Sequence, residues 1–122
     1  MNMPLVSVII TTRNEERNIT NCLESVLQQT YFCDKIEIIV VDNNSTDKTK
    51  DVVESFKVKS YKAGCKIKFF NKGPERSAQR NFGVAQAQGE YILYLDADMI
   101  LSPDVIKECA ETRIVLGNLI KK

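Results

Sequence analysis

The stretch Tyr91-Ile-Leu-Tyr-Leu-Asp-Ala-Asp-Met99 is the most informative part of the chain. Its apolar first half is typical of a buried β-strand, and its end carries two carboxylates, Asp96 and Asp98. Because a buried strand tolerates charge poorly, this pair needs a partner where the strand emerges. A magnesium ion would fit, since proteins usually hold it with one or two carboxylates plus the oxygens of a bound phosphate. A solvated turn that caps the strand is the other interpretation.

Apolar segments and helical patterns alternate along the chain. The segments expected to form strands are residues 5–12, 36–41, 66–71 and 91–95, each followed by apolar residues at helical spacing. Four strand–helix repeats require right-handed crossovers between parallel strands. The sequence therefore predicts an α/β fold with three α/β/α layers and a mostly parallel sheet, in a single domain over residues 1–122. Ligands bind such sheets outside the carboxyl ends of the strands, so Asp42 and Asp96 should face one crevice.

The helix boundaries are predicted from capping residues. Asn14 can cap the first helix, with Glu15 and Glu16 in the first turn, where the helix dipole favours acidic side chains. The second helix is expected to end near Lys57. The tail after Thr112 fits either a strand at residues 114–116 or an extension of the last helix.

Composition excludes several functional classes. A net charge of +1 gives no basic surface for nucleic acid, and no apolar run reaches the roughly 18 residues that a membrane span needs. The N-terminus does not read as a signal peptide, so a cytoplasmic protein is expected. Histidine is absent, which excludes Ser-His and Cys-His nucleophiles and leaves zinc without its commonest nitrogen ligand. The four cysteines lack Cys-x-x-Cys spacing and are expected to stay reduced.

Three more side chains could contact a phosphate-bearing ligand. Asp42 ends the stretch Ile38-Ile-Val-Val-Asp42, where it could cap the following turn or accept hydrogen bonds from a nucleobase or ribose. Arg76 and Arg80 are four residues apart near the expected start of a helix, so they share a face. That face could be solvated or could bind a diphosphate. Because the chain has no Gly-x-Gly-x-x-Gly and no Gly-x-x-x-x-Gly-Lys loop, metal and arginine would have to hold the phosphate.

Three segments together resemble the family-two inverting glycosyltransferases, which have the GT-A nucleotide-sugar fold. They are Val6-Ser-Val-Ile-Ile-Thr-Thr-Arg-Asn-Glu-Glu16, Ile39-Val-Val-Asp-Asn-Asn-Ser-Thr-Asp47, and Arg76-Ser-Ala-Gln-Arg-Asn-Phe-Gly83 leading to Gly89-Glu-Tyr-Ile-Leu-Tyr-Leu-Asp-Ala-Asp98. In order and spacing they cover the chain to about residue 106. The resemblance implies the donor-binding domain for a nucleoside diphosphate sugar, with Mn²⁺ or Mg²⁺ as cofactor.

The resemblance also implies a role for each matching residue. In chain order, the implied contacts are Thr11 and Glu15 with the nucleoside, Asp42 with the base, Arg76 or Arg80 with the base or diphosphate, Asp96 with the ribose and Asp98 with the metal. The chain departs from the family pattern, which commonly reads Pro-Thr-Tyr-Asn-Glu at residues 11–15 and Asp-Asp-Gly-Ser at residues 42–45. Arg13 stands where members commonly have tyrosine, and Asn43 where they commonly have aspartate. Arg13 is therefore a candidate substrate contact that differs from the family.

The same resemblance implies that the chain holds only the donor side of an active centre. An inverting transfer needs a general base for the acceptor hydroxyl, and in the family this base resembles a carboxylate well beyond the metal motif. The base and the acceptor, which could be a glycan, a lipid or a protein, are therefore not defined by these residues. The family likeness also suggests peripheral association with the inner face of a membrane.

Two other functional classes stay open from the sequence. A sugar nucleotidyltransferase could use a similar sheet and similar carboxylates, but it would need a glycine-rich basic loop after the first strand. Residues 11–15 do not supply that loop. A non-catalytic module that self-associates as a homodimer through an exposed sheet edge is the second alternative.

Overall fold

The computed structural model describes residues 3–112 and 119–121. Its strands form one sheet in the order β3-β2-β1-β4-β5. The parallel strands are β1 (Val6–Thr12), β2 (Ile36–Asp42), β3 (Lys66–Asn71) and β4 (Tyr91–Asp96), and the short β5 (Leu119–Lys121) pairs antiparallel with β4. The predicted mostly parallel sheet is confirmed.

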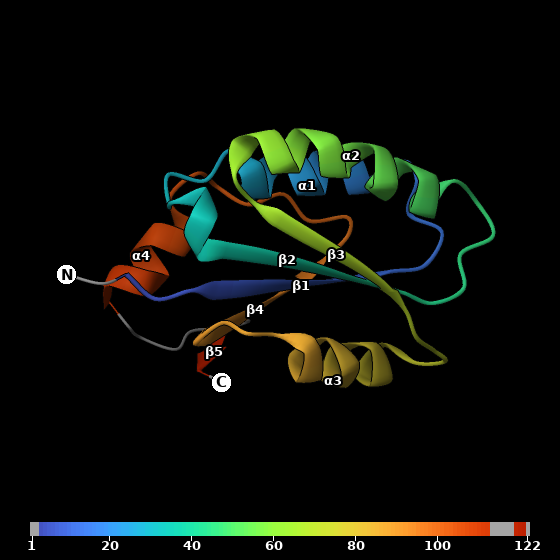
Figure 1. Ribbon diagram of the computed structural model, residues 1–122. Helices are drawn as coiled ribbons and strands as arrows, with labels where there is room; N and C mark the ends of the chain where they lie inside the picture. The colour runs from blue at the N-terminus through green and yellow to red at the C-terminus, as the bar shows by residue number, and fades with distance from the viewer. Residues whose placement is uncertain (1–2, 113–118, 122) are drawn as a thin grey trace.

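Helices cover both faces of the sheet (Figure 1). The helical elements are α1 (Ile19–Leu27), the 3₁₀ turn η1 (Cys33–Lys35), α2 (Thr49–Ala63), α3 (Arg76–Gln86) and α4 (Val105–Thr112). α1 and α2 lie on one face and α3 lies on the other, which gives the three predicted layers. Within the described residues, no helix is long and apolar enough to cross a membrane.

The alternation of side chains along β1 assigns each residue to one of two cores. Val8 and Ile10 join the larger core under α1, α2 and α4, whereas Ile9 joins the smaller core under α3 with Phe82. Every residue of β1 is buried, as expected for a central parallel strand that reads as an apolar run. Burial on both faces thus holds β1 in place, and the loop that follows Thr12 starts from this central strand.

The chain reverses direction across the sheet at β1. It moves outward from β1 to β2 and β3, then returns on the α3 side to place β4 next to β1. The register pairs Thr11 with Asp96 and Thr12 with Asp42. Because a crevice forms where the strand order reverses, these strand ends meet at the position where such folds bind ligands.

Two predicted helix boundaries are wrong. Asn14 does not cap α1, which begins at Ile19; Asn14 has a left-handed φ of 53° and binds the neighbouring loop, so Glu15 and Glu16 precede the helix. α2 does not end near Lys57 but continues to Ala63, because its first left-handed stop is Gly64, with φ of 89°.

The tail prediction is settled only in part. β5 shows that a strand returns at Leu119–Lys121, while the residues 114–116 considered for a strand lie outside the described residues.

Candidate functional site at the carboxyl edge of the sheet

A hollow of about 330 Å³ opens at the carboxyl edge of the sheet, beside the ends of β1 and β4. This is the size of a small-molecule site. Its lining residues are Thr11, Thr12, Arg13, Glu15, Asn43, Pro74, Arg76, Gln79, Asp96, Ala97 and Asp98. We call this hollow the edge pocket. It brings together most of the predicted site residues, but Asp42 and Arg80 are not in its lining.

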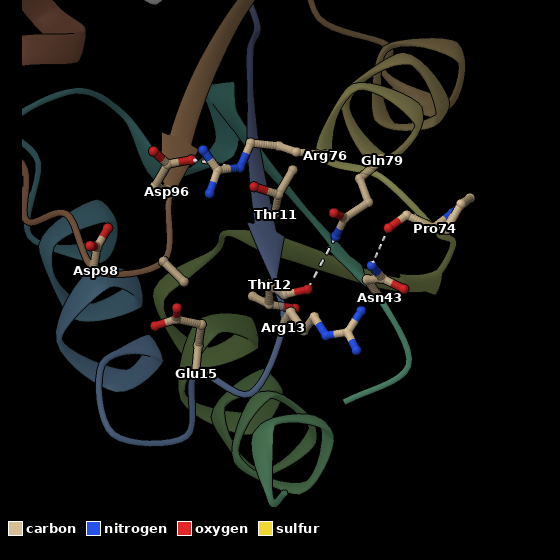
Figure 2. Close-up of a pocket in the computed structure, with 11 residues that line it drawn as sticks. Thr11, Thr12, Arg13, Glu15, Asn43, Pro74, Arg76, Gln79, Asp96 and Asp98 are labelled. Carbon is tan, nitrogen blue, oxygen red and sulfur yellow. Dashed lines mark hydrogen bonds and ion pairs between the residues drawn. The ribbon is translucent and has the colours of Figure 1, made fainter. Parts of the chain in front are cut away.

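One end of the edge pocket is acidic. Figure 2 shows Glu15, Asp96 and Asp98 on the same side of the pocket. Cys22 of α1 is buried beneath this end, and its thiol lies 3.8 Å from the backbone oxygen of Asp96. Burial raises the pKa of the Cys22 thiol to about 12, and the negative charges of the three carboxylates act in the same direction. The acidic end therefore concentrates negative charge in a small space.

Asp96 is incompletely satisfied in this arrangement. Among the residues that the structure describes, its Oδ1 is the one buried side-chain oxygen or nitrogen without a hydrogen-bond partner. Two guanidinium groups lie close but beyond hydrogen-bond distance: Arg76 Nε is 3.9 Å from Oδ1, and Arg80 Nη2 is 3.7 Å from it. Both arginines come from α3, which thus places positive charge over the end of β4.

The two arginines occupy different surroundings. The Arg76 side chain is 64% exposed and lines the edge pocket, where its guanidinium is accessible to an anion. The Arg80 guanidinium lies over the Tyr94 ring, with its central carbon 5.1 Å from the ring centre. Arg80 is therefore held against the sheet, which explains why it faces Asp96 from outside the pocket lining.

The opposite end of the pocket carries amides. Gln79 Nε2 donates to the backbone oxygens of Thr12, at 3.1 Å, and of Val41, at 2.8 Å. Asn43 Nδ2 donates to the Pro74 oxygen at 2.7 Å (Figure 2). The loop between β3 and α3 approaches closely here, because a Cβ added to Gly73 would lie 2.4 Å from Asn43 Oδ1.

Asp42 serves the turn after β2. Its carboxylate accepts hydrogen bonds from Thr12 Oγ1 at 2.6 Å and from the Ser45 backbone at 2.9 Å, and the Ser45 hydroxyl also donates to it. The residue is 4% exposed. Of the two interpretations that the sequence left open, turn formation is the one visible here. The predicted base contact of Asp42 stays a prediction.

The loops after β1 and β2 are joined by hydrogen bonds. Asn14 donates its backbone N–H to Ser45 Oγ, and its side-chain oxygen accepts from the backbones of Thr46 and Asp47. The Glu15 backbone N–H donates to Thr49 Oγ1. These contacts fix the segment that carries Arg13 and Glu15 into the pocket. Asparagine adopts the left-handed conformation of Asn14 more readily than most residues do.

Several lining residues were not predicted from the sequence as ligand contacts. They are Thr12, Asn43, Pro74, Gln79 and Ala97. Thr12 could have been found from its place opposite Asp42 at the end of a parallel pair. Gln79 had no local signal, because its role depends on how α3 docks against two strand ends.

The residues present fit a divalent cation that arrives with a phosphate. Within the described part of the chain, no group of three or more acidic or cysteine side chains could hold a metal by itself. Asp98 and Asp96 supply carboxylate oxygens at one place, and one of these oxygens lacks a hydrogen bond. Magnesium and manganese commonly take one or two carboxylates and complete their shell with ligand oxygens.

A mostly parallel α/β sheet with a polar pocket at the point where its strand order reverses defines the class: an α/β domain that binds a ligand at its strand ends. The chain belongs to glycosyl transferase family 2, whose family description matches residues 7–113. This confirms the resemblance carried by the three sequence segments.

Curated relatives agree with this assignment. The chain is 35% identical to an uncharacterized glycosyltransferase of Haemophilus influenzae, over 88% of this chain and 42% of the relative. It is 40% identical to glycosyltransferase AglE of Haloferax volcanii, over 79% of this chain and 31% of the relative. It is 34% identical to the poly(ribitol-phosphate) β-N-acetylglucosaminyltransferase TarS of Staphylococcus aureus, over 85% of this chain and 18% of the relative. The chain thus spans less than half the length of these relatives.

Solved structures share the fold. The crystal structure of S. aureus TarS residues 1–349 with UDP-GlcNAc matches with a TM-score of 0.75 and 32% identity, over 87% of this chain and 30% of that one. The mannosyltransferase PcManGT from Pyrobaculum calidifontis, in complex with GDP-Man and Mn²⁺, matches with a TM-score of 0.76 and 28% identity, over 93% of this chain and 32% of that one. The GT-A arrangement is therefore shown by structure as well as by sequence.

Proposed function

We propose that this chain is the donor-binding part of an inverting glycosyltransferase and that it binds a nucleoside diphosphate sugar together with Mn²⁺ or Mg²⁺. The observation that carries this proposal is the acidic end of the edge pocket, where Asp98 and the incompletely hydrogen-bonded Asp96 lie beside the exposed side chain of Arg76. A metal-bound diphosphate supplies a cation for the carboxylates and an anion for the guanidinium. The relatives crystallised with UDP-GlcNAc and with GDP-Man and Mn²⁺ support this ligand class.

Each pocket residue has a proposed task. Asp98 would hold the metal, which would stabilise the negative charge that develops on the departing diphosphate. Arg76 would contact the diphosphate, and Asp96 would take the ribose side. Thr11 and Glu15 would contact the nucleoside. Arg13, which differs from the family pattern, would approach it from the β1 loop.

The acceptor side is a separate part of the proposal. The general base that deprotonates the acceptor hydroxyl would be a carboxylate other than Asp96 and Asp98. The acceptor would be a glycan, a lipid or a protein, and the site of action would be the cytoplasm at the inner face of a membrane. We expect residues 1–122 by themselves to bind the donor but to transfer little sugar, because transfer also needs an acceptor site and a general base.

Isothermal titration with UDP and GDP, each with and without Mn²⁺, tests the proposal. We expect heat with at least one nucleotide, and an affinity that rises with metal. In Asp98→Ala the metal-dependent increase should disappear, with a loss of about tenfold or more, as is typical when groups around a bound metal are removed. Because Asp98 is exposed, the thermal unfolding of this variant should match the wild type.

One control variant and two contrary outcomes make the titration decisive. Glu90→Ala removes an exposed carboxylate just before β4, at the other end of that strand from the pocket, and should leave nucleotide binding unchanged. An absence of heat with both nucleotides would overturn the donor-site proposal. An unchanged metal effect in Asp98→Ala would overturn the metal assignment.

Self-association through a sheet edge is the competing use of this chain. β3 is the outer parallel strand, and it carries Lys66 and Lys68. Lysines on an edge strand discourage pairing with another chain, so this edge favours the donor-binding proposal over a dimer. Light scattering over a range of concentrations checks the point, and we expect a constant mass.

A further inference from the structure

Two cysteines that are distant in sequence meet near the amino ends of β2 and β3. Cys33 begins the 3₁₀ turn η1, which precedes β2, and Cys65 lies directly before β3. A Cβ built on Gly64, the residue before Cys65, would lie 3.8 Å from the Cβ of Cys33. Both cysteines pack in the larger core, and their thiols share a hydrogen bond. The two sulfur atoms are therefore neighbours in the folded chain.

Hydrogen bonds hold both backbones in this arrangement. The Cys65 N–H donates to the Ser60 backbone oxygen at 3.0 Å, and the Cys65 oxygen accepts from Ser60 Oγ at 2.7 Å. On the other side, the Lys35 N–H donates to the Phe32 oxygen at 2.9 Å and closes the turn that contains Cys33. A disulfide needs its two Cβ atoms about 3.5 to 4.5 Å apart, so cysteines that are already held side by side can be joined with little backbone movement.

A small reagent can reach the pair from the amino ends of the strands. A hollow of about 270 Å³ opens there, and its lining includes Asp34, Gly64 and Lys66, the residues next to the two cysteines. Cys33 is half-buried, whereas Cys65 is 2% exposed. Burial and the adjacent Cys33 thiol raise the pKa of the Cys65 thiol, so Cys65 is a poor nucleophile toward a reagent in solution. Cys33 is thus the thiol that meets the reagent first, with Cys65 behind it.

We propose that Cys33 and Cys65 form a reversible disulfide when the chain meets a small oxidised thiol such as glutathione disulfide. The Cys33 thiolate attacks glutathione disulfide and breaks its S–S bond; one glutathione stays bonded to Cys33, and the other leaves as a thiolate. The Cys65 thiol then loses its proton to solvent and attacks the Cys33 sulfur, which releases the second glutathione. Two protein thiols are oxidised, one glutathione disulfide is reduced, and the two protons end on the two glutathione thiolates.

The bond would fasten one half of the sheet. It would close the loop of residues 33–65, which contains β2 and α2 and leads into β3. Closing a long loop restricts the unfolded chain and thereby stabilises the folded one. The edge pocket lies at the other end of these strands, so this inference is independent of the proposed donor binding. The pair makes the stability of the domain depend on the redox state of its surroundings.

Trapping in glutathione redox buffers tests the proposal. The folded wild-type chain is incubated with mixtures of oxidised and reduced glutathione, free thiols are blocked with N-ethylmaleimide, and protease fragments are identified by mass spectrometry. We expect a fragment that joins Cys33 to Cys65, and its disappearance with excess reduced glutathione. The oxidised chain should unfold at a temperature about 5 °C higher than the reduced chain. The same incubation in denaturing urea should give mainly mixed disulfides, because the two thiols are then no longer adjacent.

Single variants assign the bond to these two residues. Cys65→Ser should leave Cys33 as a mixed disulfide with glutathione, and Cys33→Ser should leave Cys65 unmodified because it is buried. Oxidation should raise the unfolding temperature of neither variant. Cys22→Ala is the matched control, since it removes a buried cysteine at the carboxyl ends of the strands. This control should keep both the cross-link and the shift in unfolding temperature.

Three outcomes would overturn the proposal. They are mixed disulfides without a cross-link in the folded wild type, a cross-link to Cys22 or Cys109 instead, and a cross-link that leaves the unfolding temperature unchanged or lowers it. If Cys65→Ser does not fold, the wild-type fragments and the less buried Cys33→Ser still decide. Titration of the oxidised and reduced wild type with UDP keeps the two proposals apart. Equal affinities are expected, and an absence of nucleotide binding in both forms would overturn donor binding while leaving the disulfide result intact.

Discussion

Glu37, near the amino ends of the parallel strands, and Asp96, at their carboxyl ends, differ in whether their carboxylate oxygens are all hydrogen-bonded. At the amino edge, Glu37 accepts from Ser7 Oγ at 2.6 Å, from the Gln88 backbone at 2.9 Å and from Lys68 Nζ at 2.9 Å. Ser7 in turn accepts from the Gly89 backbone at 2.9 Å. At the carboxyl edge, Asp96 keeps an oxygen without a hydrogen bond.

The two ends of the parallel strands carry hollows of similar size. A hollow of about 270 Å³ also lies at the amino edge, where Glu37 and Gln88 are in its lining, against about 330 Å³ for the edge pocket. What differs is whether the polar groups are already paired. A closed network stabilises the fold, whereas unpaired groups are available to a ligand.

The largest expected effect is on the amino edge. Glu37→Ala should lower the free energy of unfolding by about 3 kcal/mol, because it leaves buried partners of the carboxylate without an acceptor. Urea denaturation measures this loss. Nucleotide affinity at the opposite edge should stay within about twofold, since the two sites share no hydrogen bond. A loss of stability below about 1 kcal/mol would contradict the structural role assigned to Glu37.

The next largest effect is expected at the carboxyl edge, where a substitution should weaken ligand binding and leave stability nearly unchanged. Asp96→Asn should reduce UDP affinity about tenfold, because a neutral amide oxygen accepts the proposed hydrogen bond from the ribose more weakly than a carboxylate does. The same change should leave the free energy of unfolding within about 1 kcal/mol of the wild type, because the buried oxygen of Asp96 accepts no hydrogen bond that the change could break. Titration and urea denaturation of one sample give both numbers. A variant that unfolds readily and binds normally would show that the two edges do not differ in this way.

A smaller effect is expected with pH. Burial acts to raise the pKa of Glu37, but the hydrogen bonds from Ser7, Gln88 and Lys68, with the charge of Lys68, outweigh it and lower the pKa below its usual range. The stability that depends on this carboxylate is therefore present above the unfolded pKa of about 4.3 and is lost as the pH falls through the folded value.

Urea denaturation at several pH values measures that dependence. Between about pH 5 and pH 3, the free energy of unfolding should fall more steeply in the wild type than in Glu37→Gln, which cannot ionise at this position. Parallel slopes for the two proteins would show that Glu37 is not the group responsible.

The smallest effects separate the two arginines of α3. Arg80→Ala should cost about 0.5 to 1 kcal/mol of stability through its contact with Tyr94, whereas Arg76→Ala, at a more exposed position, should cost less. Affinity for UDP should show the opposite order, with the larger loss in Arg76→Ala. Thermal unfolding measures the stability of both variants, and titration measures their affinity for UDP. The same order in both measurements would contradict the division of roles.

Much of this fold could be predicted from the sequence, because local patterns determine it. The apolar runs of β1, β2 and β4 and the acidic residues at their ends follow from strand burial alone. Asn14 was misassigned because asparagine serves equally as a helix cap and as a left-handed turn residue, and only the neighbouring loop decides between them.

The site was predicted where it lies at strand ends and missed where it depends on docking between elements. Asp96 and Asp98 follow from the end of a parallel strand, whereas Thr11 was implied by the resemblance to the family. Gln79 acquires its role only when α3 packs across two strands and meets their carbonyl oxygens. Nothing in the sequence around Gln79 indicates those distant partners.

The paired loops after β1 and β2 have a consequence for binding thermodynamics. Asn14 and Glu15 are already tied to Ser45, Thr46 and Thr49 before a ligand arrives. The conformational entropy of that segment is therefore lost during folding and need not be lost again on association. Cutting this tie, for example with Asn14→Ala, should leave the pocket chemistry intact and appear in calorimetry as a less favourable entropy of binding.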